Sequence, residues 1–362
     1  MRTNVLDVNR QLLNFKETMQ TTNPLKGWQV DREAIKFVGT DLQRPECILA
    51  DPDGTLWTAD ARGGVIRINP DGTQQVISQK ADQRFAASDN SADKYIFQGT
   101  LPNGICFDQN GNFLIANFGT DAIEIMTPDG DSKTLYDKID GQPLGKTNFV
   151  LRDSKNRIWF TVTTRSIPWT KSINEKLADG YVGLIDEKGI RIVADGFVGT
   201  NEIRLDANEE WLYVVESNAR CISRLRVQPD GSLTDREVYG PSRLSGIPDG
   251  FAFDSYGNLW ITLVLHDKLI ALTPEGDELL LLDDSDPKKV EAFDKHFWAG
   301  TVTPEIMTAC QGTLAPWMAS VTFGGPDLKT VYLGSLRGTT LPTFQSPVAG
   351  LPMVHWAERG KK

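Results

Sequence analysis

A strand–turn–strand pattern that returns six times along the chain constrains the fold more than any other feature. Each of the first five copies has a short apolar run, an aspartate, a turn of two to four residues and a second apolar run; the sixth copy is weaker. The copies begin at Glu46, Asn103, Asn148, Asn201, Asp249 and Ala319. Successive starts are 57, 45, 53, 48 and 70 residues apart, and a third apolar run follows the first five copies.

Short strands with closely spaced turn signals are typical of an all-β protein. A repeat of roughly 40–50 residues that holds about four strands is typical of a β-propeller blade. No Pro/Gly/Ser-rich linker separates the copies, which disfavours the alternative of separate small β domains. We therefore predict an all-β, six-bladed β-propeller over residues 34–362, preceded by an N-terminal extension over residues 1–33. A strand from residues 34–42 should close the last blade, since a ring of sheets otherwise keeps an open edge.

Composition narrows the partners and the compartment. The formal net charge is −10 and the basic residues are scattered, which argues against nucleic acid or an anionic membrane as partner. No stretch approaches the ~18–20 apolar residues that span a bilayer, and the first 20 residues have no apolar core typical of a signal peptide. None of the four cysteines forms a CxxC motif, so we expect free thiols and a cytoplasmic protein. The sequence does not indicate an oligomeric state.

The first residue of each of the five stronger copies carries a side-chain oxygen, five positions before the aspartate of the turn. These residues are Glu46, Asn103, Asn148, Asn201 and Asp249. The first strand of a propeller blade lines the central channel, so equivalent positions on five blades should converge at one end of it. Asp249 lies in a Pro-Asp-Gly triplet that precedes an apolar run instead of a hairpin, which supports a place in this ring.

Two carboxylates and three carboxamides at one channel mouth are unfavourable without a partner. Like charges repel, and each buried polar group left unpaired costs ~1–3 kcal/mol. A hard divalent cation removes both problems, and oxygen ligands favour Ca²⁺, with Mg²⁺ or Mn²⁺ as alternatives. The absence of His and Cys disfavours structural Zn²⁺, while a labile catalytic Zn²⁺ stays open. The same register in five copies disfavours the alternative that these side chains only satisfy backbone groups.

At these positions the chain resembles the family of regucalcin, gluconolactonase and luciferin-regenerating enzyme. The resemblance rests on PEC at 45–47, TN at 147–148, TNEIRLD at 200–206, PDGFAFDSYGNLW at 248–260 and SVTFGGPDLKTVYLGS at 320–335. It implies that Glu46, Asn201 and Asp249 bind one divalent metal at the channel mouth. It also implies that Asn148 joins the metal or holds the substrate, and that Asn103 lies near the substrate. The chain departs from the family pattern in the Cys-Ile-Leu run after Glu46 and in Ala319, which has no polar group.

The resemblance further implies a lactonase, a metal-dependent hydrolase that opens a lactone, such as a gluconolactonase acting on a sugar lactone. The metal would polarise the carbonyl and activate water, and Asp249 would be a catalytic residue that moves the proton. No Gly-x-Ser-x-Gly elbow supports a serine nucleophile. Two alternatives stay open: a metal-dependent phosphotriesterase-like hydrolase, and a propeller that only binds a small molecule.

Three further residues are candidates because of the loops in which they lie. His266 follows the second strand of the fifth copy, so its loop should overhang the mouth and make it a second catalytic candidate for proton transfer or substrate contact. Arg165 lies at the same point of the third copy and is a candidate for substrate binding. The long segment 163–180 contains Trp169, which we expect to wall the substrate pocket and set specificity; the alternative is a packing loop.

Overall fold

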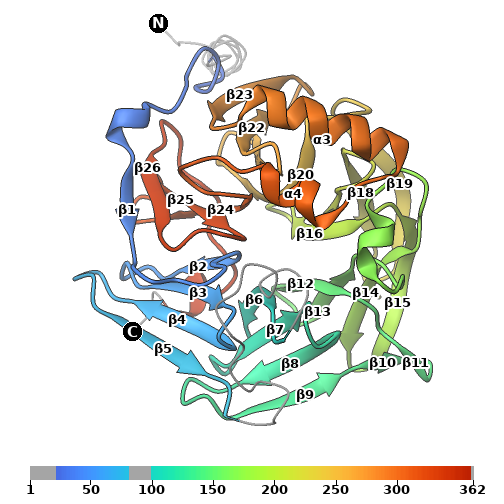
Figure 1. Cartoon of the computed structure of the whole chain (residues 1–362). Coiled ribbons are helices and arrows are strands. Elements are labelled where there is room, and N and C mark those ends of the chain that lie inside the picture. Colours follow the sequence, from blue (N-terminus) through green and yellow to red (C-terminus); the bar gives the residue numbers. More distant parts are fainter. Residues whose placement is uncertain (1–21, 81–98, 360–362) are drawn as a thin grey trace, which may run out of the picture.

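The computed structural model describes residues 22–80 and 99–359, so most of the predicted extension, residues 1–21, lies outside the described residues. Six four-stranded antiparallel sheets surround a central channel, which confirms the predicted six-bladed propeller (Figure 1). In each blade the first strand lies nearest the axis (Figure 1).

The strands of blades 1 to 3 are short and follow the repeat of the sequence. Blade 1 holds β2 (Ile48–Ala50), β3 (Leu56–Asp60), β4 (Gly64–Ile68) and β5 (Gln74–Ser78). Blade 2 holds β6 (Pro102–Phe107), β7 (Phe113–Asn117), β8 (Ala122–Met126) and β9 (Ser132–Tyr136). Blade 3 holds β12 (Thr147–Arg152), β13 (Ile158–Val162), β14 (Gly180–Asp186) and β15 (Gly189–Phe197). A small hairpin of β10 (Lys138–Ile139) and β11 (Gln142–Pro143) precedes blade 3.

Blades 4 to 6 complete the ring. Blade 4 holds β16 (Thr200–Leu205), β17 (Trp211–Glu216), β18 (Cys221–Val227) and β19 (Leu233–Tyr239). Blade 5 holds β20 (Ile247–Phe253), β21 (Leu259–Val264), β22 (Lys268–Leu272) and β23 (Glu278–Asp283). Blade 6 holds β24 (Met318–Gly324), β25 (Thr330–Ser335), β26 (Leu341–Gln345) and β1 (Lys36–Val38).

Strand β1 closes the ring from the N-terminal side. It pairs antiparallel with β26, with Phe37 opposite Pro342, which confirms the strand expected from residues 34–42. A single-turn 3₁₀ helix, η1 (Arg32–Ala34), leads into β1. Before it, the backbone N–H of Val30 donates to the carbonyl of Leu281 at 2.9 Å, so the segment preceding β1 also packs against blade 5.

The aspartate of the repeat has a structural task that recurs in alternate blades. It accepts a hydrogen bond from the indole N–H of the tryptophan six residues later, at 2.9 Å each time, in the pairs Asp51–Trp57, Asp153–Trp159 and Asp254–Trp260. All three indoles are buried in the core between blades. The hydrogen bond therefore ties the turn to the core and satisfies an indole that would otherwise be buried without a partner.

Two helices between blades 5 and 6 were not predicted from the sequence. Helix α3 (Pro287–Ala299) begins after Asp286, whose side chain accepts the backbone N–H of Lys288, and ends at Gly300 in the left-handed region. Helix α4 (Pro304–Ala309) follows. Together they account for the 70-residue interval before the sixth copy, and Figure 1 shows α3 crossing in front of blade 5. A four-residue helix, α5 (Trp356–Arg359), ends the described chain.

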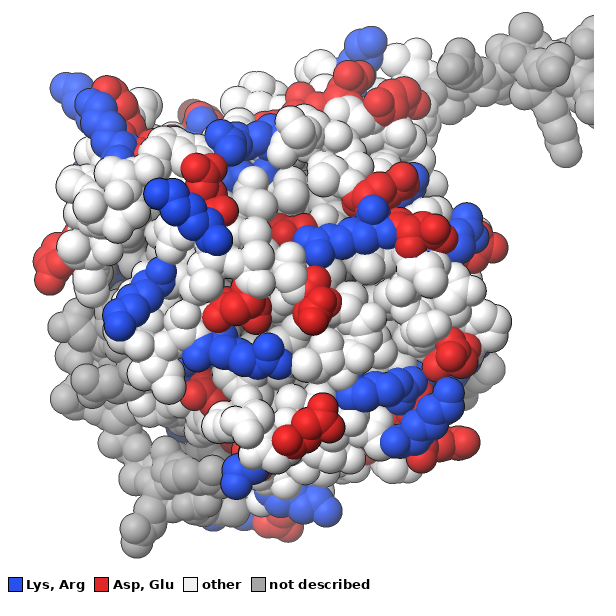
Figure 2. Space-filling model, turned by 90° about the vertical axis from the view of Figure 1, so that its right-hand side faces the viewer, with Lys and Arg blue, Asp and Glu red and all other residues white. Residues whose placement is uncertain are grey.

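The distribution of surface charges and the state of the cysteines are those expected from the scattered basic residues and the absence of a CxxC motif. Lys and Arg side chains are interspersed with Asp and Glu over the face drawn in Figure 2, so this face carries no extended basic patch. All four cysteines are buried and free. Within residues 22–80 and 99–359, no helix is long and apolar enough to span a membrane.

Candidate metal and substrate site

The structure brings the five ring residues together at one end of the channel. All five line a single cavity of about 120 Å³. Their exposed fractions are 3% for Glu46, 1% for Asn103, 5% for Asn148, 9% for Asn201 and 3% for Asp249. The site is therefore a buried polar ring at the bottom of a small cavity.

A β-bulge aims the ring residue in four of the five blades. The register between the first and second strands shifts within the following intervals: Pro102–Ile105, Thr147–Val150, Thr200–Ile203 and Pro248–Phe251. Each interval contains one ring residue. A bulge adds a residue to one strand and turns a side chain out of the regular alternation, which explains how these polar groups face the mouth. In blade 1, Glu46 lies just before β2 and needs no bulge.

Gly250 follows Asp249 in the bulge of blade 5 and allows a close approach of blade 6. A Cβ atom at this position would lie 2.5 Å from the carbonyl oxygen of Ala319 and 2.7 Å from Oε1 of Glu202. Both distances are too short for non-bonded atoms. The glycine of this Pro-Asp-Gly triplet is thus required by packing at the ring.

Asn103 links three parts of the ring. Its Nδ2 donates to Oε1 of Glu46 at 2.7 Å and to the carbonyl oxygen of Asn148 at 3.0 Å. Its Oδ1 accepts from Nη2 of Arg44 at 2.6 Å. Because both ends of this amide are engaged, Asn103 holds its neighbours in place, and its oxygen, unlike those of Asn148 and Asn201, already accepts a hydrogen bond.

Three ring residues each keep one buried oxygen that lacks a hydrogen-bond partner in the described part of the chain. These atoms are Oδ1 of Asn148, Oδ1 of Asn201 and Oδ1 of Asp249. A fourth buried oxygen, Oε2 of Glu46, faces the Arg44 guanidinium at 3.0 Å. The amide of Asn201 is fixed by its Nδ2, which donates to Oγ of Ser217 at 3.1 Å. Four such oxygens at one cavity fit a hard divalent cation, which needs oxygen donors.

The amide oxygens are essential to this donor set. Among residues 22–80 and 99–359, no group of three or more His, Cys, Asp or Glu side chains could hold a metal. The ring offers only the carboxylates of Glu46 and Asp249, so a cation would need Asn148 and Asn201 as well. An all-oxygen set of this kind disfavours soft metals.

Sequence analysis missed Arg44, a buried guanidinium beside the ring. Its Nη1 lies 3.0 Å from Oε2 of Glu46 and donates to the carbonyl oxygen of Pro102 at 3.1 Å. Burial lowers the pKa of Arg44, while the charges of Glu46 and Asp249 oppose that shift. A single arginine two residues before Glu46 gives no sequence signal of burial, because the burial arises only when the blades close around it.

A second buried ion pair lies next to the ring, on blade 4. Glu202 is 1% exposed, and Nη2 of Arg204 lies 2.8 Å from its Oε2. Burial raises the pKa of Glu202 to about 7. Glu202 is the second residue of the bulge that also holds Asn201, so both project into the channel and not onto the opposite faces of a regular strand.

The charges around the ring do not balance without a cation. Burial raises the pKa of Glu46, and burial together with the charges of Glu46 and Glu202 raises the pKa of Asp249 well above its usual range. When ionised, these three carboxylates face two guanidinium groups, those of Arg44 and Arg204. The surplus negative charge favours binding of a cation at the mouth.

The loop over residues 163–180 lies beside the cavity, as expected. Its 3₁₀ helix η3 (Trp169–Ser172) places Trp169 in the cavity wall, edge-on to Phe118 with ring centroids 5.3 Å apart. Two neighbours do not cover the cavity: Ile167 is 87% exposed and Pro168 is exposed. Of the three apolar residues in this part of the loop, only Trp169 walls the cavity.

The structure does not place Arg165 or His266 at the cavity. Arg165 is exposed, with its guanidinium 4.3 Å from the ring centroid of Tyr181. His266 is 1% exposed beneath α3, where its Nε2 lies 3.3 Å from Oδ1 of Asp294 and its ring packs edge-on to Phe293. The expected placement of His266 over the mouth is wrong, because the unpredicted helix α3 covers the loop that was expected to overhang it.

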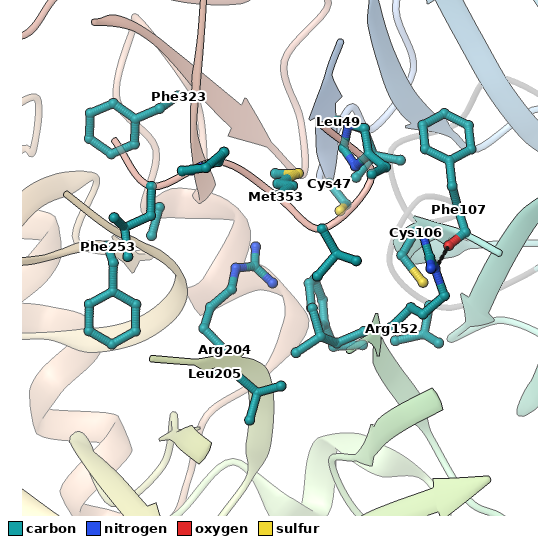
Figure 3. Close-up of a pocket in the computed structure, with 18 of the residues that line it drawn as sticks. Cys47, Leu49, Cys106, Phe107, Arg152, Arg204, Leu205, Phe253, Phe323 and Met353 are labelled. Atoms are coloured by element: carbon teal, nitrogen blue, oxygen red, sulfur yellow. Dashed lines mark hydrogen bonds between the residues drawn. The ribbon is translucent and has the colours of Figure 1, made fainter. Parts of the chain in front are cut away.

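A second, larger cavity of about 340 Å³ lies toward the other end of the first strands. Figure 3 shows Arg204 pointing into it, among Phe253, Met353 and Cys47. The segment 351–355 covers this end of the channel. Ion pairs anchor the segment that follows: Arg152 with Glu358 at 2.5 Å, and Arg359 with Asp51 at 2.7 Å. The C-terminal segment thus closes the channel opposite the ring.

Comparison with known proteins agrees with the fold. A family model described as the SMP-30/Gluconolactonase/LRE-like region matches residues 45–283. An uncharacterised protein of Sulfolobus acidocaldarius is 25% identical over 203 residues, which cover 55% of this chain. The Bacillus subtilis protein YvrE, provisionally named a sugar lactone lactonase, is 23% identical over 202 residues, also 55% of this chain. The matches span about three fifths of the length of these two relatives (60% and 57%).

Solved structures share the fold at lower identity. A gluconolactonase from Xanthomonas campestris superposes with a TM-score of 0.60 at 19% identity, covering 86% of this chain and 90% of its own. Regucalcin from Agrobacterium tumefaciens, described as a calcium-binding protein, gives 0.62 at 13% identity, covering 88% and 96%. A luciferin-regenerating enzyme gives 0.63 at 15% identity, covering 88% and 98%.

Proposed function

Because the chain belongs to the SMP-30/gluconolactonase/LRE-like family, we propose that it is a metal-dependent lactonase, which opens the ring of a lactone by hydrolysis. The observation that carries the proposal is the set of four buried oxygens at one cavity, three of which lack a hydrogen-bond partner in the described residues. Such a set is costly unless a ligand completes it. The relatives whose names refer to lactone hydrolysis and calcium binding support the choice of this reaction and of a divalent cation.

In this proposal Glu46, Asn148, Asn201 and Asp249 hold one divalent cation, Ca²⁺ in the first place, with Mg²⁺, Mn²⁺ or Zn²⁺ as alternatives. The match of their oxygens to a hard cation supports it. When bound, such an ion polarises a carbonyl oxygen and lowers the pKa of water. The partner is a small lactone or related ester, because the cavity of about 120 Å³ leaves no room for a macromolecule.

Each residue around the site then has a defined task. Asp249 takes the proton from the attacking water and returns it to the leaving ring oxygen; its position in the cavity wall, next to the proposed ion, supports this role. Asn103 keeps Glu46 in place through its hydrogen bond. Asn148 orients the substrate or the ion through its Oδ1. Trp169 walls the cavity and excludes water from it.

The decisive experiment is a panel of lactones and simple esters, assayed with metal-stripped protein and again after each divalent ion is restored. We expect hydrolysis of at least one lactone that chelator abolishes and one of these ions restores. An organophosphate arm tests the phosphotriesterase alternative. Turnover of organophosphates but of no lactone, or no turnover of any compound with any ion, would contradict the lactonase proposal.

A further inference from the structure

We infer that the substrate is a lactone with an apolar substituent and not a polyhydroxylated sugar lactone. The inference rests on the proposed lactonase function and names its substrate class. The side chains of the cavity wall above the polar ring are mostly apolar. They include Phe118, Trp169, Val264, Leu265, Met307 and Leu336.

These apolar residues come from separate parts of the chain. Phe118 follows β7, Val264 ends β21, Met307 lies on α4 and Leu336 follows β25. Trp169 comes from η3 in the long loop of blade 3. Four different blades and the inserted helix pair therefore contribute apolar surface to one small space. A reacting carbonyl held at the ring would have its substituent surrounded by these side chains.

The hydroxyl groups of the wall already donate their hydrogens within the protein, and so does one amide hydrogen of Asn218. Thr163 Oγ1 donates to the carbonyl oxygen of Thr200 at 2.8 Å, and Ser217 Oγ donates to that of Pro248 at 2.7 Å. Asn218 Nδ2 donates to the carbonyl oxygen of Ser172 at 2.8 Å. The hydroxyl group of Ser172 donates to Trp169 at 2.7 Å.

The engaged donors and the apolar side chains of the wall favour one of the two substrate classes. Each hydroxyl group of a sugar lactone would give up its hydrogen bonds to water on entry and find these donors occupied, which disfavours its binding. An alkyl or aryl group loses no hydrogen bond on entry. Its transfer out of water raises the binding affinity by about fourfold for each buried methylene. The wall therefore favours lactones with alkyl or aryl substituents over lactones that carry several hydroxyl groups.

The test uses three six-membered lactones on the metal-loaded protein: δ-valerolactone, δ-octanolactone with its propyl side chain, and glucono-δ-lactone. We expect kcat/KM to rise about fourfold for each of the first two or three added carbons. The kcat/KM for glucono-δ-lactone should be at least about tenfold lower than that for δ-valerolactone, which has no substituent. Equilibrium binding of cyclohexanone and of its 2-propyl derivative, which lack the ester bond, should show the same alkyl preference without turnover.

A matched pair of variants assigns the preference to the wall. Val264→Thr keeps the volume and adds one hydroxyl group to the cavity, so the ratio of kcat/KM for the propyl lactone over the unsubstituted lactone should fall about tenfold. Val238→Thr makes the same change on the half-exposed outer strand β19, far from the cavity, and should leave the ratio unchanged.

The outcomes separate this inference from the proposed function. If glucono-δ-lactone is hydrolysed as well as or better than the propyl lactone, the substrate class is wrong while the lactonase function stands. If the propyl lactone is preferred but Val264→Thr leaves the ratio unchanged, the wall does not set the preference and the inference is overturned. If no lactone is turned over with any ion, the proposed function fails and the inference fails with it.

Discussion

Nη1 of Arg44 lies 3.0 Å from Oε2 of Glu46, which is one of the two carboxylates of the ring. Both side chains are buried, with 7% and 4% of their areas exposed. The protein thus supplies its own positive charge to a group that we propose as a metal ligand. A divalent ion at the ring would have to share Glu46 with Arg44, which should lower the affinity for the ion.

The first prediction concerns this pair. In Arg44→Met the metal-free protein should lose about 3–5 kcal/mol of unfolding free energy, because the Glu46 carboxylate is left buried without its counter-charge. The same change should tighten binding of the divalent ion, since Glu46 no longer shares its charge. Thermal unfolding with and without ion, together with calorimetric titration, measures both effects. Arg44→Lys, which keeps the charge, is the control. Equal stability and equal affinity in Arg44→Met and the wild type would contradict the role given to Arg44.

The second prediction tests the task of the repeat aspartate. Asp254 is buried and accepts three backbone N–H groups, the Asn258 amide and the Trp260 indole. Asp254→Ala should therefore cost about 3 kcal/mol or more of unfolding free energy in urea. Asp71, in an exposed hairpin turn of blade 1, accepts only from Thr73 and provides the matched control. Comparable losses in Asp254→Ala and Asp71→Ala would show that burial of the indole contact is unimportant.

The third prediction concerns pH and the C-terminal segment. His355 is 5% exposed, its Nε2 lies 2.9 Å from the carbonyl oxygen of Ala50, and burial lowers its pKa below 6.5. The charge of Asp51 opposes this shift, and those of Arg359 and Arg152 add to it. The unfolded chain then binds a proton near pH 6.5 that the folded chain binds only at lower pH.

The stabilisation linked to His355 is therefore complete above pH 6.5 and is lost as the pH falls from 6.5 through the folded pKa, by about 1.4 kcal/mol for each unit of pKa difference. Urea unfolding between pH 7.5 and 5.5 should show a steeper loss of stability for the wild type than for His355→Gln, which cannot titrate. Parallel pH profiles for the two proteins would show that His355 has the same pKa in the folded and unfolded states.

The fourth prediction follows from the position of His266. Because its Nε2 lies 3.3 Å from Oδ1 of Asp294 beneath α3, and not at the cavity, His266→Gln should change kcat/KM for a lactone by less than about threefold. Asp249→Asn should lower kcat by about 100-fold or more, within the range typical of a lost proton-transfer group. The two variants are compared with ion concentration held saturating. A loss of activity in His266→Gln as large as that in Asp249→Asn would show that His266 takes part in catalysis.

The sequence predicted the parts of this molecule that follow from local periodicity. Equivalent positions such as Asn148 and Asn201 could be aligned because each blade repeats the same strand, turn and register. The β-bulges that aim them were not predicted, because a bulge depends on how two strands pair. Closure by residues 34–42 was predicted because an open sheet edge is unfavourable in any ring.

Other features depend on contacts between distant segments. Arg44 and Glu202 are charged residues that ordinarily lie at the surface, and only the closed ring of blades buries them. Helix α3 did carry a local signal, since Asp286 precedes it, Pro287 is its first residue and Gly300 follows its last residue. That signal lies in the long interval before the sixth copy, which the repeat pattern does not cover. The placement of His266 was wrong for the same reason, because α3 covers it.

Calorimetric titration of Ca²⁺ into metal-stripped protein is the sharpest test of the proposal that the ring holds one divalent cation. We expect one ion per chain for the wild type. We expect a loss of affinity of about 100-fold or more in Glu46→Gln and in Asp249→Asn, since each change removes a charged ligand and leaves a side chain of nearly the same size. Val238→Thr, remote from the ring, should bind like the wild type. Absence of binding to the wild type by Ca²⁺, Mg²⁺, Mn²⁺ and Zn²⁺ alike, or full binding to both ring variants, would contradict this proposal.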